Sequence, residues 1–339
     1  MNIGIRQLAV GNRNKGKLFH VALCAILFAA CFSAQAQQQP APVRICWLSA
    51  GGGADHSALD AFRDGMRDLG YVEGRNLVID ARWGNGSNQR LNRYAVELVS
   101  SMPKVLVTQA GQAIFAVRRT KPEIPIVFGL SGDPVEAGLV ASFAHPGGYF
   151  TGVSFLSLEL VGKRMELLKE TIVTLKRVAV LANPAHPGEK SEQRETRAAA
   201  KALGLDVEYF PASPGPAYDS VLPEVVKSRS QALFVFPDAG VIGNSEKIAA
   251  FSVKNRIPAM SGWAEFAERG NLMTYGPILN EGYRRLATYV DKILRGAKPM
   301  NLPVELPKKF ELVINLKAAK QIGLIIPPNI LARADRVIR

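Results

Sequence analysis

Short β-branched runs alternate with longer amphipathic helical patterns along this chain. The apolar run at 43–49 is typical of a buried strand, and the pattern at 57–69 places its apolar side chains on one helical face. The alternation continues through strand patterns at 76–82, 104–108 and 125–130 and helical patterns at 89–101 and 112–120. Such a repeated strand–helix order predicts a parallel sheet that is covered by helices on both faces.

The same alternation begins again further along the chain. Helical patterns lie at 160–172, 191–203, 220–228 and 245–255, and strand patterns lie at 177–181, 205–210, 232–236 and 257–260. A long amphipathic helix over 280–294 and a strand-rich tail over 303–326 complete the pattern. We therefore predict an α/β protein with two doubly wound parallel-sheet lobes.

Polar residues follow many of the predicted strands. In open parallel sheets ligands bind outside the carboxyl ends of the strands, and two such edges that face each other form a cleft. By position alone, the predicted ligand-binding residues are Ser49, His56, Ser57, Thr108, Gln109, Ser131, Asp133, Asn183, Asp238 and Trp263.

Several of these residues have a structural interpretation as well. Asp133 precedes Pro134 and is a typical turn former, and Ser57 is suited to cap the helix that it precedes. Asp238 can face an amine of a ligand or cap the following helix, and the sequence favours neither. Trp263 can form a flat cleft wall or belong to the core.

The first 36 residues have the pattern of a secretory signal peptide. Arg6, Arg13, Lys15 and Lys17 form a basic start, an apolar run extends from Leu18 to Phe32, and Ala34-Gln35-Ala36 is a small-x-small cleavage site. An alternative is that Phe28–Cys31 acts as a lipobox, with Cys31 acylated. Either alternative predicts export.

Composition excludes several classes of function. Cleavage after Ala36 leaves about 303 residues, lowers the net charge from +13 to +9, and leaves Cys46 as the only cysteine, which we expect to be a buried structural thiol. The basic residues are scattered, so a nucleic-acid footprint is not indicated.

Sequence motifs for catalysis or cofactor binding are missing as well. The three remaining histidines lack metal-ligand spacing, so no metal is expected. The run Gly51-Gly52-Gly53 has neither the G-x-G-x-x-G spacing nor a following G-K-[ST], the two patterns that indicate nucleotide binding. No G-x-S-x-G nucleophile motif occurs in the chain. We therefore expect no cofactor and no catalytic residue.

Two long runs resemble a known family. The segments 125–140 (PIVFGLSGDPVEAGLV) and 146–154 (PGGYFTGVS) are similar to the signature of the substrate-binding proteins of ABC transporters, whose relatives include tryptophan-binding-type proteins. Shorter matches are GMRDLGYVEG at 65–74, LANP at 181–184, LRGAKP at 294–299 and INLKAA at 314–319. The resemblance covers nearly the whole chain after the signal segment.

The resemblance implies the type I periplasmic binding protein fold, in which three crossovers join two lobes. It places the crossovers near 151–154, 272–276 and 301–304, with lobe one at 43–150 plus 277–301 and lobe two at 155–271 plus 305–339. The chain has Thr108-Gln109-Ala110-Gly111 where the family often has a Thr-Pro-Ala-Ala-type loop. It also has Tyr149-Phe150 where the family often has Asn. Because the first departure lies at the predicted ligand site, a relative's ligand is not transferred.

The function implied is that of an exported, monomeric solute receptor. It would capture a small amino-acid-like or aromatic solute in the cleft and deliver it to an ABC permease in the inner membrane, which places the protein in the periplasm. Two alternatives stay open: a partner that presents a ligand to a membrane sensor, and a secreted α/β hydrolase.

Overall fold

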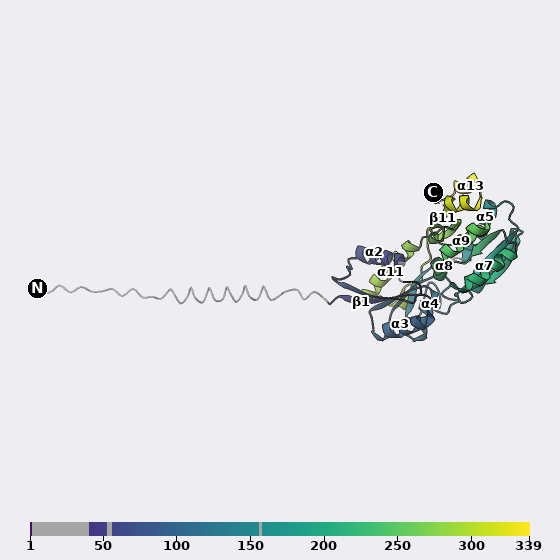
Figure 1. Cartoon of the computed structure of the whole chain (residues 1–339). Helices are drawn as coiled ribbons and strands as arrows, with labels where there is room; N and C mark the ends of the chain where they lie inside the picture. The colour runs from purple at the N-terminus through teal and green to yellow at the C-terminus, as the bar shows by residue number, and fades with distance from the viewer. Residues whose placement is uncertain (2–40, 53–55, 156–157) are drawn as a thin grey trace. The chain divides into compact units, whose positions relative to one another are not determined.

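Two mainly parallel β-sheets organise the chain, as the computed structural model shows (Figure 1). The structure describes Met1 and residues 41–52, 56–155 and 158–339. Residues 42–339 form one compact unit. The predicted signal peptide, its cleavage site and Cys31 lie outside the described residues.

The first sheet has the strand order β2-β1-β3-β4-β5, and all of its strands pair in parallel. Its strands are β1 (Val43–Ser49), β2 (Leu77–Trp83), β3 (Val105–Gln109), β4 (Ile126–Leu130) and β5 (Phe150–Ser154). Helices α2 (Ser57–Asp68) and α11 (Leu279–Leu294) pack side by side over one face, and α3 (Asn88–Ser100) and α4 (Gly111–Arg119) pack together over the other (Figure 1).

Strand β1 shows why this sheet is covered on both faces. Ile45 and Trp47 belong to the cluster formed with α2 and α11. Cys46 and Leu48 belong to the cluster formed with α3 and α4. Because successive side chains of a strand point to opposite faces, this continuous apolar run fills two cores.

The second sheet has the order β12-β11-β10-β9-β8-β6-β7, and only β10 and β11 pair antiparallel among the described strands. Its strands are β6 (Arg177–Ala182), β7 (Asp206–Pro211), β8 (Ala232–Val235), β9 (Ala259–Ser261), β10 (Met273–Pro277), β11 (Phe310–Asn315) and β12 (Arg336–Ile338). Its helices are α5 (Leu158–Thr171), α6 (Glu189–Ala202), α7 (Ala217–Lys227), α8 (Ala239–Gly243), α9 (Ser245–Asn255), α10 (Ala264–Glu268), α12 (Leu316–Ile322) and α13 (Pro328–Leu331).

The predicted fold class is confirmed. The expected strands and long helices agree with the observed ones to within three residues at each end. The expectation of a strand-rich tail is wrong, because only β11 lies within 303–326 and α12 follows it directly. Asn315 caps α12 by accepting a hydrogen bond from the backbone N–H of Ala318 at 3.0 Å, so a helix begins where the strand pattern ends.

We refer to each sheet with its covering helices as a lobe. The chain leaves the first lobe after β5, returns to it at α11 after β10, and leaves again after the 3-10 turn η1 (Pro299–Asn301). The segments 151–154 and 272–276, which the resemblance assigns to crossovers, lie largely within β5 and β10. The exact lobe boundaries stay a prediction.

Gly276 is a position where close packing excludes any side chain. A Cβ atom there would lie 1.8 Å from the carbonyl oxygen of Gly262, so we expect Gly276→Ala to lower the free energy of unfolding by about 2 kcal/mol or more. Gly162→Ala in α5 is the control, since nothing lies within 4 Å of its added Cβ. It should stabilise the helix by about 0.5–1 kcal/mol. Urea unfolding measures both, and equal stability of the two variants would contradict the packing argument.

Candidate functional site

A cavity of about 280 Å³ lies between the carboxyl ends of the strands of the two lobes. From the first lobe it is lined by the ends of β1 and β3 and the start of α2, and from the second by α8 and the β9–α10 segment. The first turn of α11 lines it as well. We call it the interlobe cavity; its lining residues are Ser49, Gly51, Gly52, Ser57, Ala58, Gln109, Ala239, Ile242, Gly243, Trp263, Glu265, Arg269, Leu279, Asn280 and Tyr283.

The structure brings four of the predicted site residues together in this cavity. They are Ser49, Ser57, Gln109 and Trp263. The Ser49 hydroxyl accepts a hydrogen bond from the backbone N–H of Gly51 at 3.1 Å and so holds the loop after β1. Ser57 is the first residue of α2 and His56 is its N-cap, so the expectation that Ser57 caps this helix is wrong.

Asn183 and Asp238 line a separate, smaller cavity of about 150 Å³. The Asn183 side-chain amide donates to Asp238 Oδ2 at 2.9 Å, and Asp238 Oδ1 accepts from the backbone N–H of Gly240 at 2.5 Å. Asp238 is thus the N-cap of α8, which is the capping alternative that the sequence left open. Both of its oxygens are engaged within the second lobe.

The remaining predicted residues do not line the interlobe cavity. His56 is exposed and lies edge-on to Trp83, with ring centroids 5.0 Å apart. Thr108 is fully buried, and its hydroxyl has no hydrogen-bond partner in the described part of the chain. Asp133 Oδ1 accepts from the backbone N–H groups of Val135 and Glu136 at 2.7 and 3.1 Å, which is a turn.

Ser131 takes part in a direct contact between the lobes. Its Oγ lies 2.5 Å from Nε2 of His186, which follows β6. Beside this pair, the Pro187 carbonyl oxygen would lie 2.4 Å from a Cβ added to Gly132. Ser191 Oγ donates to Glu136 Oε2 at 2.5 Å. We call these contacts the flank latch, and they show that the lobes are closed on this side of the cleft.

Burial determines the protonation of His186. The imidazole is 8% exposed, and burial lowers its pKa, while the negative charge of Asp238 acts in the opposite direction. A neutral imidazole is therefore the form that the closed latch favours.

Sequence reasoning missed the charged and aromatic residues beyond the strand ends. Glu265 and Arg269 lie on and just after α10, and Tyr283 lies on α11; all three line the interlobe cavity. Tyr283 falls on the apolar face of its helix, so its pattern indicated core packing. Glu265 and Arg269 follow Trp263 by two and six residues, and no spacing in the sequence indicated that they line a cavity.

A buried arginine supports the wall of the cavity in the second lobe. The Arg164 side chain is fully buried, donates from Nε to the Tyr275 carbonyl at 2.7 Å, and lies against Gly262, next to Trp263. Burial lowers the pKa of Arg164 to about 10 and raises the pKa of Glu192 to about 8 against the effect of the nearby Arg164 charge.

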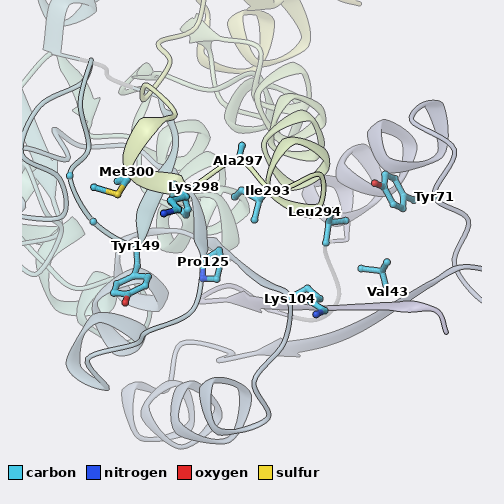
Figure 2. Close-up of a pocket in the computed structure, with 14 residues that line it drawn as sticks. Val43, Tyr71, Lys104, Pro125, Tyr149, Ile293, Leu294, Ala297, Lys298 and Met300 are labelled. Carbon is cyan, nitrogen blue, oxygen red and sulfur yellow. The ribbon is translucent and has the colours of Figure 1, made fainter. Parts of the chain in front are cut away.

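A larger cavity of about 830 Å³ lies at the opposite edge of the first sheet (Figure 2). Val43, Lys104, Pro125 and Tyr149 line it from the starts of strands, and residues 293–300 line it from the end of α11 onward. None of the predicted ligand residues belongs to it. Because ligands of such sheets bind at the carboxyl edge, the interlobe cavity is the candidate functional site.

Among residues 41–52, 56–155 and 158–339, no group of three or more His, Cys, Asp or Glu side chains is placed to hold a metal ion. Within the same ranges, no helix is both long and apolar enough to cross a membrane.

The family model of the ABC transporter substrate binding protein matches residues 51–338. The chain belongs to this family. A tyrosine-binding protein of Clostridioides difficile is 23% identical over 275 residues, which cover 80% of this chain and 79% of that protein. The similarity thus extends over both lobes.

Solved structures of other proteins share the fold. A conserved domain protein of Vibrio cholerae is 30% identical, with a TM-score of 0.81 over 87% of this chain and 99% of that one. A domain of Streptococcus pneumoniae in complex with L-Trp is 23% identical, with a TM-score of 0.81 over 88% and 100%. The expected type I periplasmic binding fold is therefore confirmed.

The flank latch gives a test of closure in this family member. Gly132→Ala should hold the lobes apart, because the added Cβ meets the backbone of Pro187. We expect ligand affinity to fall by about tenfold or more, since the closed form would be populated less. Small-angle scattering should show a larger radius of gyration than for the wild type. Gly162→Ala, whose added Cβ would have nothing within 4 Å, should change neither quantity.

The latch histidine should make binding depend on pH. Its pKa is lowered on burial, so the closed form binds a proton less readily than an exposed imidazole with a pKa near 6.5. The closed form is therefore fully stabilised above a pH of about 6.5 and loses stability as the pH falls below it. We expect ligand affinity to fall with it, by at most about tenfold per pH unit. Titration calorimetry at pH 7.5 and 5 measures this. His186→Gln should reduce the difference, and an undiminished fall in the variant would rule out His186 as its origin.

Proposed function

We propose that this protein is an exported receptor of an ABC import system that binds a small amino-acid-like solute with an aromatic side chain. The interlobe cavity carries this proposal. Its volume of about 280 Å³ is at the lower end of the range for small-molecule sites, which suits a solute of this size. Trp263, Tyr283, Leu279 and Ile242 supply apolar walls, and Ser49 and Gln109 supply hydrogen-bonding groups.

The relatives support an aromatic amino acid as the class of solute. One is a tyrosine-binding protein, and another was solved with L-Trp. The aromatic side chains of Trp263 and Tyr283, only 5% and 6% exposed, come from different parts of the chain to the same cavity. Two such rings offer flat apolar contact area to an aromatic solute.

Closure would couple binding to transport. A solute that contacts both lobes interacts more extensively with the closed form, so it shifts the equilibrium toward closure. Strand β5 and the segment after η1 run side by side: the Ser154 N–H donates to the Glu305 carbonyl at 3.0 Å, and the Glu305 N–H donates to the Gly152 carbonyl at 3.0 Å. Arg285 of α11 donates hydrogen bonds from Nε and Nη2 to the two carboxylate oxygens of Glu305, both at 2.7 Å. These bonds attach α11 to the segment that follows η1.

The closed receptor would then dock on a membrane permease. The signal-like pattern of the first 36 residues supports export to the periplasm, where this family works at the membrane surface. We propose no catalytic role, because the site combines a closable cavity with no nucleophile–base arrangement among its described lining residues.

Substitution of the aromatic wall tests the proposal. Trp263→Leu should weaken binding of L-Trp and L-Tyr by about tenfold, because much of the flat contact area is lost. Tyr149→Ala, which removes an exposed aromatic residue at the larger cavity, is the matched control and should bind both solutes as the wild type does. Titration calorimetry gives the affinities, and thermal unfolding confirms that both variants are folded.

Uptake distinguishes import from ligand presentation to a sensor. Cells that lack the protein should take up less labelled L-Trp or L-Tyr than the parent strain. Unchanged uptake, together with binding in vitro, would contradict the transport role and favour the sensory alternative.

A further inference from the structure

The larger cavity has the size of a ligand site in its own right. It lies at the edge of the first sheet where the strands begin, and its described lining residues include none of those of the interlobe cavity. Its volume of about 830 Å³ falls within the range of small-molecule sites, which is about 300–1,000 Å³. A molecule bound there would not occupy the proposed solute site.

Two rows of side chains give this cavity the form of a groove (Figure 2). One row comes from the end of α11 and the turn after it, and includes Ile293, Leu294 and Met300. The other row comes from the starts of strands, and includes Val43 and Pro125. All five side chains are apolar, so an elongated apolar molecule could contact both rows along its length.

The charge of the groove is positive. Lys104 lies in the strand row and Lys298 in the helix row (Figure 2), and no acidic residue is among the described lining residues. Asp291 contacts the lining residue Tyr71, but its Oδ1 already accepts hydrogen bonds from the Tyr71 hydroxyl at 3.1 Å and from Arg295 Nε at 2.8 Å. The groove therefore favours an anion.

The end of α11 does not account for Lys298. A lysine near the C-terminus of a helix can bind the last carbonyl groups of that helix. Here the backbone N–H groups of residues 295–297 donate to the carbonyls of residues 291–293 at 2.9–3.0 Å. The backbone thus supplies partners for these carbonyls itself.

We propose that the larger cavity binds an amphipathic carboxylate with a single alkyl chain, such as a free fatty acid. Lys104 and Lys298 would attract the carboxylate, and the chain would lie between the two apolar rows. A peptide suits these walls less well, because each of its residues brings a backbone N–H and C=O that need hydrogen-bond partners. This proposal goes beyond the proposed function and does not depend on it.

Three probes with the same alkyl chain separate the role of charge from that of the chain: dodecanoate, dodecan-1-ol and dodecylammonium. Their affinities are measured by titration calorimetry on the chain from residue 37 onward, at concentrations below those at which the probes form micelles. Dodecanoate should bind at least tenfold more tightly than dodecylammonium, with the alcohol between them. Each methylene added to the carboxylate should increase affinity by up to about fourfold.

Neutralising both lysines tests the assignment of the charge. A variant with Lys104→Gln and Lys298→Gln should lose about tenfold in affinity for dodecanoate and bind dodecan-1-ol as the wild type does. The matched control carries Lys201→Gln and Lys320→Gln, which remove two exposed lysines from α6 and α12 of the second lobe. It has the same net charge and should change neither affinity. Thermal unfolding shows whether both variants are folded.

The place of binding is tested with Trp263→Leu, which alters the interlobe cavity alone. It should leave dodecanoate affinity unchanged, whether or not the wild type binds L-Trp. A loss of dodecanoate binding in this variant would overturn the proposal, because the fatty acid would then occupy the interlobe cavity.

Other results would also overturn the proposal. One is that the wild type does not bind dodecanoate, or that the double-lysine variant binds it equally well. Another is binding that appears only after residues 37–41 are removed, since the segment before Val43 would then be the occupant. A third is association with phosphatidylglycerol vesicles without binding of free dodecanoate, which would indicate a membrane surface instead.

Discussion

The burial of each central strand on both faces is the constraint on which the rest of this structure depends. Strand β1 fills one core with Ile45 and Trp47 and another with Cys46 and Leu48, so it leaves no face for a ligand. The same holds for β6, where Val178 and Val180 face one core and Ala179 and Leu181 face the other. Polar chemistry is thereby confined to the strand ends, and parallel pairing gathers those ends at one edge of each sheet.

The closed cleft divides into two regions with different physical characters. At the flank latch, Ser131 and His186 meet directly and the backbones of Gly132 and Pro187 lie in close contact. At the interlobe cavity, the lobes are separated by space lined with aromatic and charged side chains. The contacts of the latch join the lobes directly, whereas the proposed solute site is the cavity, so closure and the proposed selection of a solute would depend on separate residues.

Much of the fold could be predicted from the sequence because buried strands and amphipathic helices differ strongly in the spacing of their apolar residues along the chain. The prediction failed where that period is short or interrupted. Strand β5 contains Gly152 with φ of 152°, and the tail after β11 turns into α12 at Asn315. In β5 a tertiary contact decides the residue: only glycine fits at position 152, because a Cβ there would lie 2.1 Å from the Phe128 carbonyl oxygen.

The strand-end rule located part of the lining of the interlobe cavity for a similar reason. It found Ser49, Gln109 and Trp263, which are fixed by the strands that they end or follow. It could not tell that Asp238 caps α8, because a cap and a ligand contact require the same residue at the same place. Glu265 and Arg269 depend on the direction in which α10 leaves β9, which no spacing in the sequence specifies.

Cys46 is the only cysteine in the part of the chain that the structure describes, and it is fully buried, with its Sγ 4.0 Å from the Ser101 hydroxyl. Burial raises the pKa of this thiol, so the reactive thiolate is scarce at neutral pH. In a chain cleaved after Ala36, which keeps Cys46 alone, a cysteine introduced on the rim of the cleft would therefore be the one that a thiol-directed dye modifies. The native core thus leaves the surface open to selective labelling, and lobe closure could be followed as a change in fluorescence without removing a natural residue.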